Sequence, residues 1–240
     1  MKHILSLISL SLLLFGCDRY TYVHVHSYVY SYVDVDNLRL DTLDKGDHLK
    51  IAVIPENIIC NYDVTKNEDM FEYYCKLHND TSFPKTKIST TQFITSRYLI
   101  YDYSSVNVTA DVDWDFNHPS GRSLNDIVHF VAMSPYKYIL SGYEALCPNP
   151  LSDGTASEYY KDVYMSESFN SQMPDYPIDK RCSDLMTDDL ILLDFCTNGP
   201  RYKYALAFLV FETPPPKPCT VNVKLTATTG KEFGASIDVE

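Results

Sequence analysis

Two histidines near the N-terminus have the spacing of a metal-binding pair on a β-strand. His24 and His26 are two residues apart, so on a strand both imidazoles would share one face, about 7 Å apart. Imidazole is a common metal ligand, but two ligands without a third do not hold an ion. The third would have to come from Asp34, Asp36 or a neighbouring strand. We therefore predict surface histidines and no cofactor, with a metal site as the alternative.

Three alternating aspartates raise the question of a calcium loop. An EF-hand loop that begins at Asp111 requires glycine at its sixth position and glutamate at its twelfth, where this chain has Phe116 and Arg122. The motif fails, and a calcium site of another kind stays open. The alternation instead predicts a half-buried strand, because successive side chains point to opposite faces. The apolar face would carry Val112, Trp114 and Phe116, and the solvated face Asp111, Asp113 and Asp115.

Motifs for nucleophilic catalysis are incomplete. Residues 121–125 begin like the G-x-S-x-G nucleophile elbow, but Asn125 stands where the second glycine belongs. Cys75 and His78 are close in sequence, whereas a Cys–His dyad normally joins distant segments of a chain. The sequence contains no HExxH, P-loop or GxGxxG motif. We therefore name no catalytic residue.

The N-terminus has the organisation of an exported lipoprotein. A basic start is followed by the uncharged run Ile4–Phe15, which is too short for a membrane-spanning helix of about 20 residues. Gly16 and Cys17 then resemble the lipobox of bacterial lipoproteins, although Phe15 replaces the usual small or β-branched residue. The resemblance implies a signal peptide of residues 1–16, cleavage between Gly16 and Cys17, and acyl chains such as palmitate on Cys17. The alternative is an ordinary secretory signal.

The segment after the leader alternates between two kinds of residue. Valines from Val23 to Val35 share one parity, and tyrosines and histidines share the other. This pattern predicts a β-ribbon over residues 17–36 that tethers the domain to the lipid. Its aromatic face is either a docking surface or a face packed on the domain, and the sequence favours neither. The candidate docking residues are Tyr22, Tyr28, Tyr30 and Tyr32.

Charge and cysteine content restrict the class of protein further. The formal net charge of -12 repels phosphate backbones and argues against a nucleic-acid partner. Export would place the remaining cysteines in an oxidising compartment, where disulfides form, but spacing does not choose among the pairings. These cysteines are Cys60, Cys75, Cys147, Cys182, Cys196 and Cys219.

Turn signals and residue types divide the rest of the chain mainly into strands. Helices are expected only at residues 68–78 and from Ser123 to Phe130, where Ser123 resembles the start of a capping box. Residues 142–188 show no sustained period and are expected to be an irregular insertion. Strands are expected at residues 48–54 (ended by Pro55), 92–103, 105–116, 190–196, 202–212, 219–227 and 231–239.

This succession of elements predicts an all-β, mainly antiparallel fold. We expect an immunoglobulin-like β-sandwich over residues 37–240, with the insertion at residues 142–188 and one or two short helices. The prolines between 214 and 218 predict a stiff connector between two strands.

Two segments resemble a group of uncharacterised lipoproteins from the Bacteroidota. The first runs from Asp115 to Asp126 and reads DFNHPSGRSLND; the second runs from Phe208 to Glu212 and continues through Pro214 to the closing hairpin. The resemblance implies a β-rich domain of unknown activity behind a lipid anchor, and it brings no catalytic residues. The extra cysteines and the Tyr/His alternation depart from that group.

These observations lead to one expected function and one alternative. We expect a lipoprotein of the cell envelope, anchored in the outer membrane, that binds or scaffolds an envelope protein or a glycan without catalysis. The alternative is an envelope hydrolase with its active site in residues 142–188. Converging carboxylates or a Cys/His pair in a cleft would favour the hydrolase, and an aromatic surface would favour the binding module.

Overall fold

The computed structural model describes most of the chain after residue 28. The described residues are 29, 31–43, 48–63, 66–81, 97–164, 172–173, 175–194 and 205–240. They form a mainly β fold with few helices, in which antiparallel pairs of strands predominate. The predicted β-rich, mainly antiparallel class is therefore confirmed.

The first two strands form a long antiparallel pair. β1 (Ser31–Thr42) runs without a break across residues 36 and 37, so residues 31–36 belong to the sheet. β2 (Lys50–Tyr62) continues past Pro55, and the predicted end of the strand there is wrong. Pro55 pairs with Leu38 of β1, while the opposite edge of β2 is paired only over residues 50–53. Proline is tolerated there because a free strand edge needs no N–H donor.

The pairing of β1 with β2 contains a bulge. Val35 pairs with Ile58 and Asp34 pairs with Cys60, so Ile59 is the extra residue of β2. Asn57, just before the bulge, has a left-handed backbone with φ of 52°, which asparagine adopts more readily than most residues. The bulge leaves both Ile58 and Ile59 exposed to solvent.

β1 and β2 belong to a six-stranded sheet. Its other strands are β3 (Arg97–Leu99), β5 (Val128–Ser134), β8 (Tyr176–Arg181) and β9 (Ala207–Phe211). The order across the sheet is β3-β1-β2-β9-β5-β8, and only β1 and β3 are parallel. The strand expected at residues 202–212 is thus found as β9 in the described part of that range. β8 comes from the segment expected to be irregular and forms one edge of the sheet.

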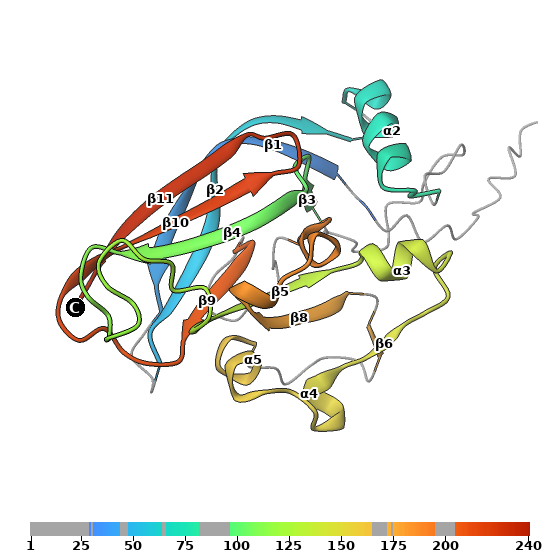
Figure 1. Cartoon of the computed structure of the whole chain (residues 1–240). Coiled ribbons are helices and arrows are strands. Elements are labelled where there is room, and N and C mark those ends of the chain that lie inside the picture. The colour runs from blue at the N-terminus through green and yellow to red at the C-terminus, as the bar shows by residue number, and fades with distance from the viewer. Residues whose placement is uncertain are drawn as a thin grey trace, which may run out of the picture.

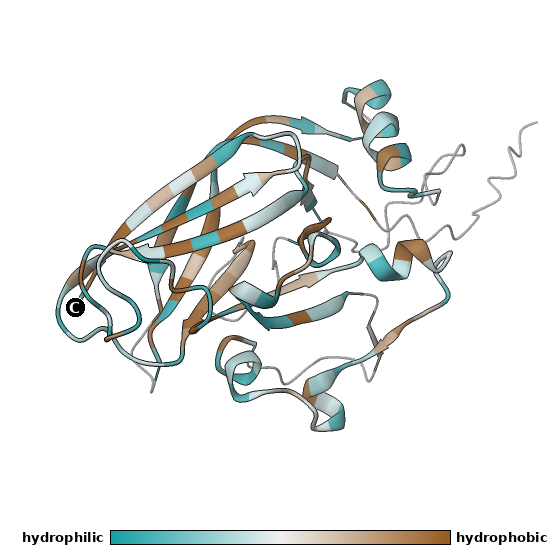
Figure 2. Ribbon diagram, in the orientation of Figure 1, coloured by the Kyte–Doolittle hydropathy of each residue, from teal (hydrophilic) through white to brown (hydrophobic). Residues whose placement is uncertain are grey.

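The second sheet has three antiparallel strands. They are β4 (Tyr103–Ala110), β10 (Cys219–Ala227) and β11 (Glu232–Val239), in the order β11-β10-β4. Buried and exposed positions alternate along β10, and Figure 2 shows hydrophobic and hydrophilic residues alternating along it. The strands predicted at residues 219–227 and 231–239 are thus confirmed. Their alternation reflects one buried face, which is typical of an antiparallel sheet.

The two sheets pack face to face around one apolar core (Figure 1). Every second residue of the facing strands enters this core, an arrangement consistent with a β-sandwich. Core residues from the larger sheet include Val33, Val35, Ile51, Val53, Phe130 and Leu209, and those from the smaller sheet include Val106, Val108, Val221, Val223, Leu225 and Phe233.

A third layer covers the outer face of the six-stranded sheet. It contains β6 (Cys147–Pro148), α4 (Pro150–Asp153), α5 (Glu158–Val163) and β7 (Gln172–Met173). Tyr160 and Val163 of α5 pack on Val131, Phe208 and Val210 of the sheet. These central strands are apolar on both faces because both faces are covered. The segment expected as an irregular insertion therefore supplies a layer of the fold as well as strand β8.

Two helices and two 3-10 turns complete the fold. α2 (Glu68–Leu77) confirms the helix predicted at residues 68–78, and α3 (Tyr136–Leu140) follows β5. Phe71 and Cys75 of α2 form a small cluster with Tyr32, Tyr98 and Tyr138. The 3-10 turns are η1 (Cys182–Asp184) and η2 (Thr187–Leu190).

The predictions around residues 105–130 are partly wrong. The strand expected to reach Phe116 ends at Ala110, and the helix expected from Ser123 to Phe130 does not form in these described residues. Asn125 explains the missing helix, because its side chain accepts from the backbone N–H of Val108 and donates to the carbonyl of Val106. These bonds hold the chain against β4 in place of a helical turn.

The strand expected at residues 190–196 is also absent from its described part. Leu192 has a left-handed backbone with φ of 49°, which interrupts an extended conformation. Asp194 then pairs with Tyr98 of β3 and donates its backbone N–H to the carbonyl of Met133 in β5. This single residue links two strands that lie apart in the order of the larger sheet.

Candidate functional site

The connection between β4 and β5 folds back on β4 and is held there by backbone hydrogen bonds. We call residues 111–126 the Phe116 loop. The backbone N–H of Gly121 donates to Ala110 (2.8 Å) and that of Leu124 donates to Val108 (2.8 Å). Gly121 has φ of 77°, a conformation in which side chains are strained, so glycine suits this turn. The loop is therefore fixed to the sheet along much of its length.

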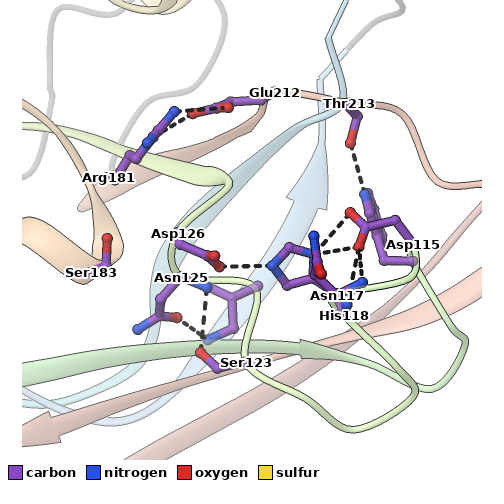
Figure 3. A network of polar contacts seen from close by, with 12 residues as sticks. Asp115, Asn117, His118, Ser123, Asn125, Asp126, Arg181, Ser183, Glu212 and Thr213 are labelled. Carbon is purple, nitrogen blue, oxygen red and sulfur yellow. Dashed lines mark hydrogen bonds and ion pairs between the residues drawn. The ribbon is translucent and has the colours of Figure 1, made fainter.

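His118 binds two carboxylates of the Phe116 loop (Figure 3). Its Nδ1 lies 2.8 Å from each carboxylate oxygen of Asp115, and its Nε2 lies 2.9 Å from Oδ1 of Asp126. An ionised carboxylate only accepts hydrogen bonds, so both ring nitrogens must donate, which requires the imidazolium form. We call these three residues the His118 cluster. It joins the start of the loop to its end.

The pKa directions agree with this arrangement. Burial on its own lowers the pKa of His118, but the hydrogen bonds to Asp115 and Asp126 together outweigh it and raise that pKa above its ordinary value. The same contact, with help from backbone N–H groups, lowers the pKa of Asp115. The His118 cluster therefore holds one positive charge between two negative ones.

The serine of the loop does not pair with this histidine. Ser123 donates to Oδ1 of Asn107 (3.0 Å), and its hydroxyl accepts from the backbone N–H of Asn125. Both nitrogens of His118 are already bonded to carboxylates. A nucleophile needs a base with a free nitrogen beside it. In this arrangement the cluster fixes the loop and does not activate Ser123.

Trp114 anchors the loop in the core. Its ring stacks on Phe211 with centroids 5.2 Å apart, and its Nε1–H donates to Thr213 (2.9 Å). Two residues further on, Phe116 is 99% exposed. The prediction that Trp114 and Phe116 share a buried face is therefore wrong. The reason is that residues 111–120 turn instead of extending: the carboxylate of Asp113 accepts from the backbone N–H of Ser120.

The aspartates proposed as calcium ligands have other partners. Asp111 accepts from the backbone N–H of Thr220, and Asp115 accepts from those of Asn117 and His118. The carboxylates therefore bind separate parts of the loop and its neighbour. Within the described ranges, no three His, Cys, Asp or Glu side chains converge as a metal centre requires.

A second histidine lies between the sheet and α5. His129 of β5 places Nδ1 3.3 Å from Asp179 of β8 and Nε2 3.1 Å from Glu212. Tyr159 of α5 stacks on the imidazole at 3.9 Å, and Arg181 binds Glu212 through two nitrogens. Burial lowers the pKa of His129, but the hydrogen bonds to both carboxylates outweigh it and the pKa is raised. Both ring nitrogens are again occupied.

Ser157 approaches this second cluster without contacting the histidine. Its hydroxyl donates to the Asp179 carboxylate, and its oxygen caps α5 by accepting from the backbone N–H of Tyr160. Ser157 and His129 thus bind the same carboxylate instead of each other. This differs from a catalytic triad, in which the histidine lies between serine and aspartate.

A third histidine is buried beside α2. His78 places Nε2 3.0 Å from Asp102 and Nδ1 2.9 Å from the carbonyl of Tyr74, and its ring stacks on Tyr32. Asp102 also accepts from the backbone N–H of Leu192 (3.1 Å). Cys75 lies in the same cluster, where burial raises the pKa of its thiol. A reactive cysteine needs a lowered thiol pKa, so the Cys75–His78 arrangement has the opposite character.

Most of the candidate lipidation, metal-pair and docking residues predicted from sequence lie outside the described part of the chain. Tyr32 is described and is fully buried, with its hydroxyl 3.3 Å from Nδ1 of His78. Of the two alternatives left open for the aromatic face, Tyr32 follows the one in which the face packs on the domain, because a buried ring offers no docking surface. The residues outside the described ranges are Gly16, Cys17, Tyr22, His24, His26, Tyr28 and Tyr30.

The described cysteines form no disulfide with one another. All but Cys60 are buried, and burial raises the pKa of the Cys147 thiol to about 11 and that of Cys182 to about 12. These thiols pack as small apolar side chains. The free cysteines are Cys60, Cys75, Cys147, Cys182 and Cys219, while Cys196 lies outside the described residues.

Sequence reasoning did not find the His118 cluster or the exposure of Phe116. The Asp115-x-x-His118 spacing was available as a signal for the first contact. The Asp126 contact depends on the turn of the loop, which no local pattern specified.

Comparisons with known proteins add no further constraint. No protein-family model, no curated protein and no solved structure matches this chain. In the part of the chain that the structure describes, no helix has both the length and the apolar character needed to span a membrane.

Proposed function

We propose that this chain is a lipid-anchored protein of the bacterial cell envelope that binds another envelope protein through the Phe116 loop, without catalysis. The acyl chains on Cys17 hold it in the outer membrane. The observation that carries the binding role is Phe116, a 99% exposed aromatic side chain on a loop fixed by Trp114 and His118.

A fixed, exposed phenylalanine is suited to protein recognition. Burying such a side chain in a partner contributes about 1.5–3 kcal/mol from apolar surface alone. The loop is already ordered, so binding loses little conformational entropy. Aromatic residues that fill a pocket commonly dominate the energy of an interface.

The charges around Phe116 indicate what the partner offers. The Phe116 loop carries four aspartates (Asp111, Asp113, Asp115 and Asp126) and two positive charges, those of Arg122 and the His118 imidazolium, so acidic residues are in excess. A partner with an apolar pocket and a basic rim complements this loop. Phosphate-rich partners such as nucleic acids do not.

The position of the loop is compatible with an anchor at the other end of the domain. β1 begins beside α2, whereas the connection between β4 and β5 lies at the opposite end of the sandwich (Figure 1). β4 runs from the α2 end to the Phe116 loop, a distance of about 25 Å. An anchor that precedes β1 therefore leaves Phe116 directed away from the membrane.

The other expectations remain as further proposals. A glycan is the alternative ligand, because an aromatic ring also stacks on sugar faces. The hydrolase alternative assigns the active site to residues 142–188. It gains no catalytic base from the described His78, His118 or His129, because both ring nitrogens of each are already hydrogen-bonded. The immunoglobulin-like arrangement of the sandwich likewise stays a prediction.

Photo-crosslinking in intact cells tests the binding role. A photoreactive phenylalanine analogue replaces Phe116 in one strain and Leu140, an exposed residue of α3, in a matched control. We expect one defined protein adduct at position 116 that is absent at position 140. A carbohydrate adduct would favour the glycan alternative, and the same products at both positions, or none, would overturn the proposal.

Radiolabelled palmitate tests the anchor separately. The wild-type protein should incorporate label and a Cys17→Ala variant should not. Equal labelling of both proteins, or of neither, would refute acylation of Cys17.

A further inference from the structure

One face of α2 is apolar and exposed. Met70, Tyr73 and Leu77 are 39%, 55% and 53% exposed, respectively. They occupy positions i, i+3 and i+7, which lie within about 60° of one another around a helix of 3.6 residues per turn. We call these three residues the α2 stripe.

The rest of α2 has a clear division of roles. Phe71 and Cys75 are buried against the domain. The charged residues occupy the remaining arc, so the α2 stripe lies between the packed face and the charged face. The charged residues are Glu68, Asp69, Glu72 and Lys76.

The α2 stripe exposes more aligned apolar surface than a helix packed on a domain in water normally does. Single exposed apolar residues are normal, but three aligned on one short helix form a patch. β2 precedes α2 in the sequence, and its bulge also exposes Ile58 and Ile59. The same strand and the helix that follows it thus expose five apolar side chains.

The stripe lies at the end of the molecule where the lipid tether enters. Val29 and Tyr32, at the start of the described chain, share a cluster with Phe71 of α2. Eleven residues lie between Cys17 and Val29 in the sequence, which allows a separation of at most about 40 Å. An acylated Cys17 therefore keeps Val29, and α2 beside it, within about 40 Å of the bilayer surface, a distance that includes direct contact.

We propose that the α2 stripe docks on the lipid surface that holds the anchor, with Met70, Tyr73 and Leu77 in the interfacial region. This inference rests on the proposed acylation of Cys17. Amphipathic helices bind membranes with their apolar face about 5–10 Å into the headgroup boundary, and tyrosine favours that depth.

Charge selects the kind of lipid. α2 carries three acidic residues and one lysine, and the whole chain has a net charge of -12. Strongly anionic lipids would repel this surface, so a zwitterionic bilayer is the expected occupant. Lys76, on the charged side, can extend its ammonium to the headgroups.

Fluorescence quenching by brominated lipid tests the docking. The mature lipoprotein, purified with its acyl chains, is reconstituted in phosphatidylcholine vesicles with or without bromine on the acyl chains. Tyr73→Trp reports on the stripe, and Phe116→Trp is the matched control at the other end of the domain. Both proteins retain Trp114, the one native tryptophan, which is buried and gives the same background.

We expect the emission of the tryptophan introduced at position 73 to fall by about half in brominated vesicles. The emission of the tryptophan introduced at position 116 should stay unchanged. Adding Met70→Asp and Leu77→Asp to Tyr73→Trp should abolish the quenching. Equal quenching at positions 73 and 116, or none at 73, would overturn the docking while mass spectrometry still finds acylated Cys17. If the mass is that of unacylated protein, the anchor fails and this inference fails with it.

Discussion

Nε2 of His118 lies 2.9 Å from Oδ1 of Asp126, eight residues later in the chain. With Asp115 on the other ring nitrogen, this contact closes the Phe116 loop through one imidazolium ion. Asp126 precedes β5 and Asp115 follows β4, so the contact ties together the two ends of a connection between the sheets. The charge of His118 should therefore control the stability of the loop.

The stabilisation due to His118 should depend on pH with a definite sign. The raised pKa of His118 means that its contribution is complete below the ordinary histidine value of about 6.5 and is lost as pH rises through the folded value. The lowered pKa of Asp115 means that its contribution is present above about 4 and is lost as pH falls. The contact is therefore strongest between these limits.

Urea unfolding of wild-type protein and His118→Gln, followed by Trp114 fluorescence, measures this effect. We expect the variant to be less stable by roughly 1–3 kcal/mol near pH 6, and the difference to shrink as pH rises towards 9. His129 is present in both proteins, so its titration cancels in the difference. A difference that does not change with pH would show that the ring acts by packing alone.

Replacing Phe116 by alanine should weaken partner binding without changing stability. The side chain is 99% exposed, so the free energy of unfolding should change by less than about 0.5 kcal/mol. Affinity for the crosslinked partner should fall at least about tenfold, as expected for an aromatic residue at the centre of an interface. Leu140→Ala, a matched exposed change on α3, should leave affinity unchanged. Unaltered affinity in Phe116→Ala would remove the loop from the interface.

Asp102 should contribute strongly to the stability of the fold, although no catalytic role is assigned to it. It accepts from Nε2 of His78 and from the backbone N–H of Leu192, whose left-handed backbone is strained. Asp102→Ala leaves both donors without this partner and should cost about 2–4 kcal/mol in chemical denaturation. Asp36→Ala, at an exposed position of β1, is the control and should cost less than about 0.5 kcal/mol. Similar costs for the two variants would contradict this role.

Two tyrosines test whether residues 147–164 form a layer of the folded core. Tyr164 is buried and packs edge-on against Phe208, whereas Tyr73 is exposed on α2. Tyr164→Ser should lower the unfolding free energy by about 3–5 kcal/mol, and Tyr73→Ser in solution should change it by less than about 0.5 kcal/mol. Thermal melts of both variants give the comparison. A tolerated Tyr164→Ser would indicate that the layer contributes little to stability.

The parts of the fold that followed local patterns were predictable. β10 and β11 alternate between buried and exposed residues, and α2 carries acidic residues in its first turn and a lysine in its last turn. Such patterns predict secondary structure because the spacing of apolar residues matches the repeat of a strand or a helix with one buried face. They also led to the correct β-rich class.

The parts that failed depend on contacts between distant segments. Pro55 remains in a strand because only one edge of β2 is paired at that point. Asn125 prevents a helix through bonds to the backbone of β4, and Leu192 interrupts a strand while its N–H donates to Asp102. The exposed state of Phe116 follows from a turn held by side chains. None of these partners can be located from neighbouring residues alone.

The position of β9 in the six-stranded sheet has a consequence for biogenesis. β9 comprises residues 207–211, yet it lies between β2 and β5, which are made much earlier. Until β9 emerges, the strands on either side of it keep unpaired edges and apolar faces, a state that favours aggregation. A chain that crosses a membrane from its N-terminus would complete its central sheet only near the end of passage. Proteins that hold unfolded chains in the receiving compartment would therefore protect this one until β9, which lies within about the last 35 residues, arrives.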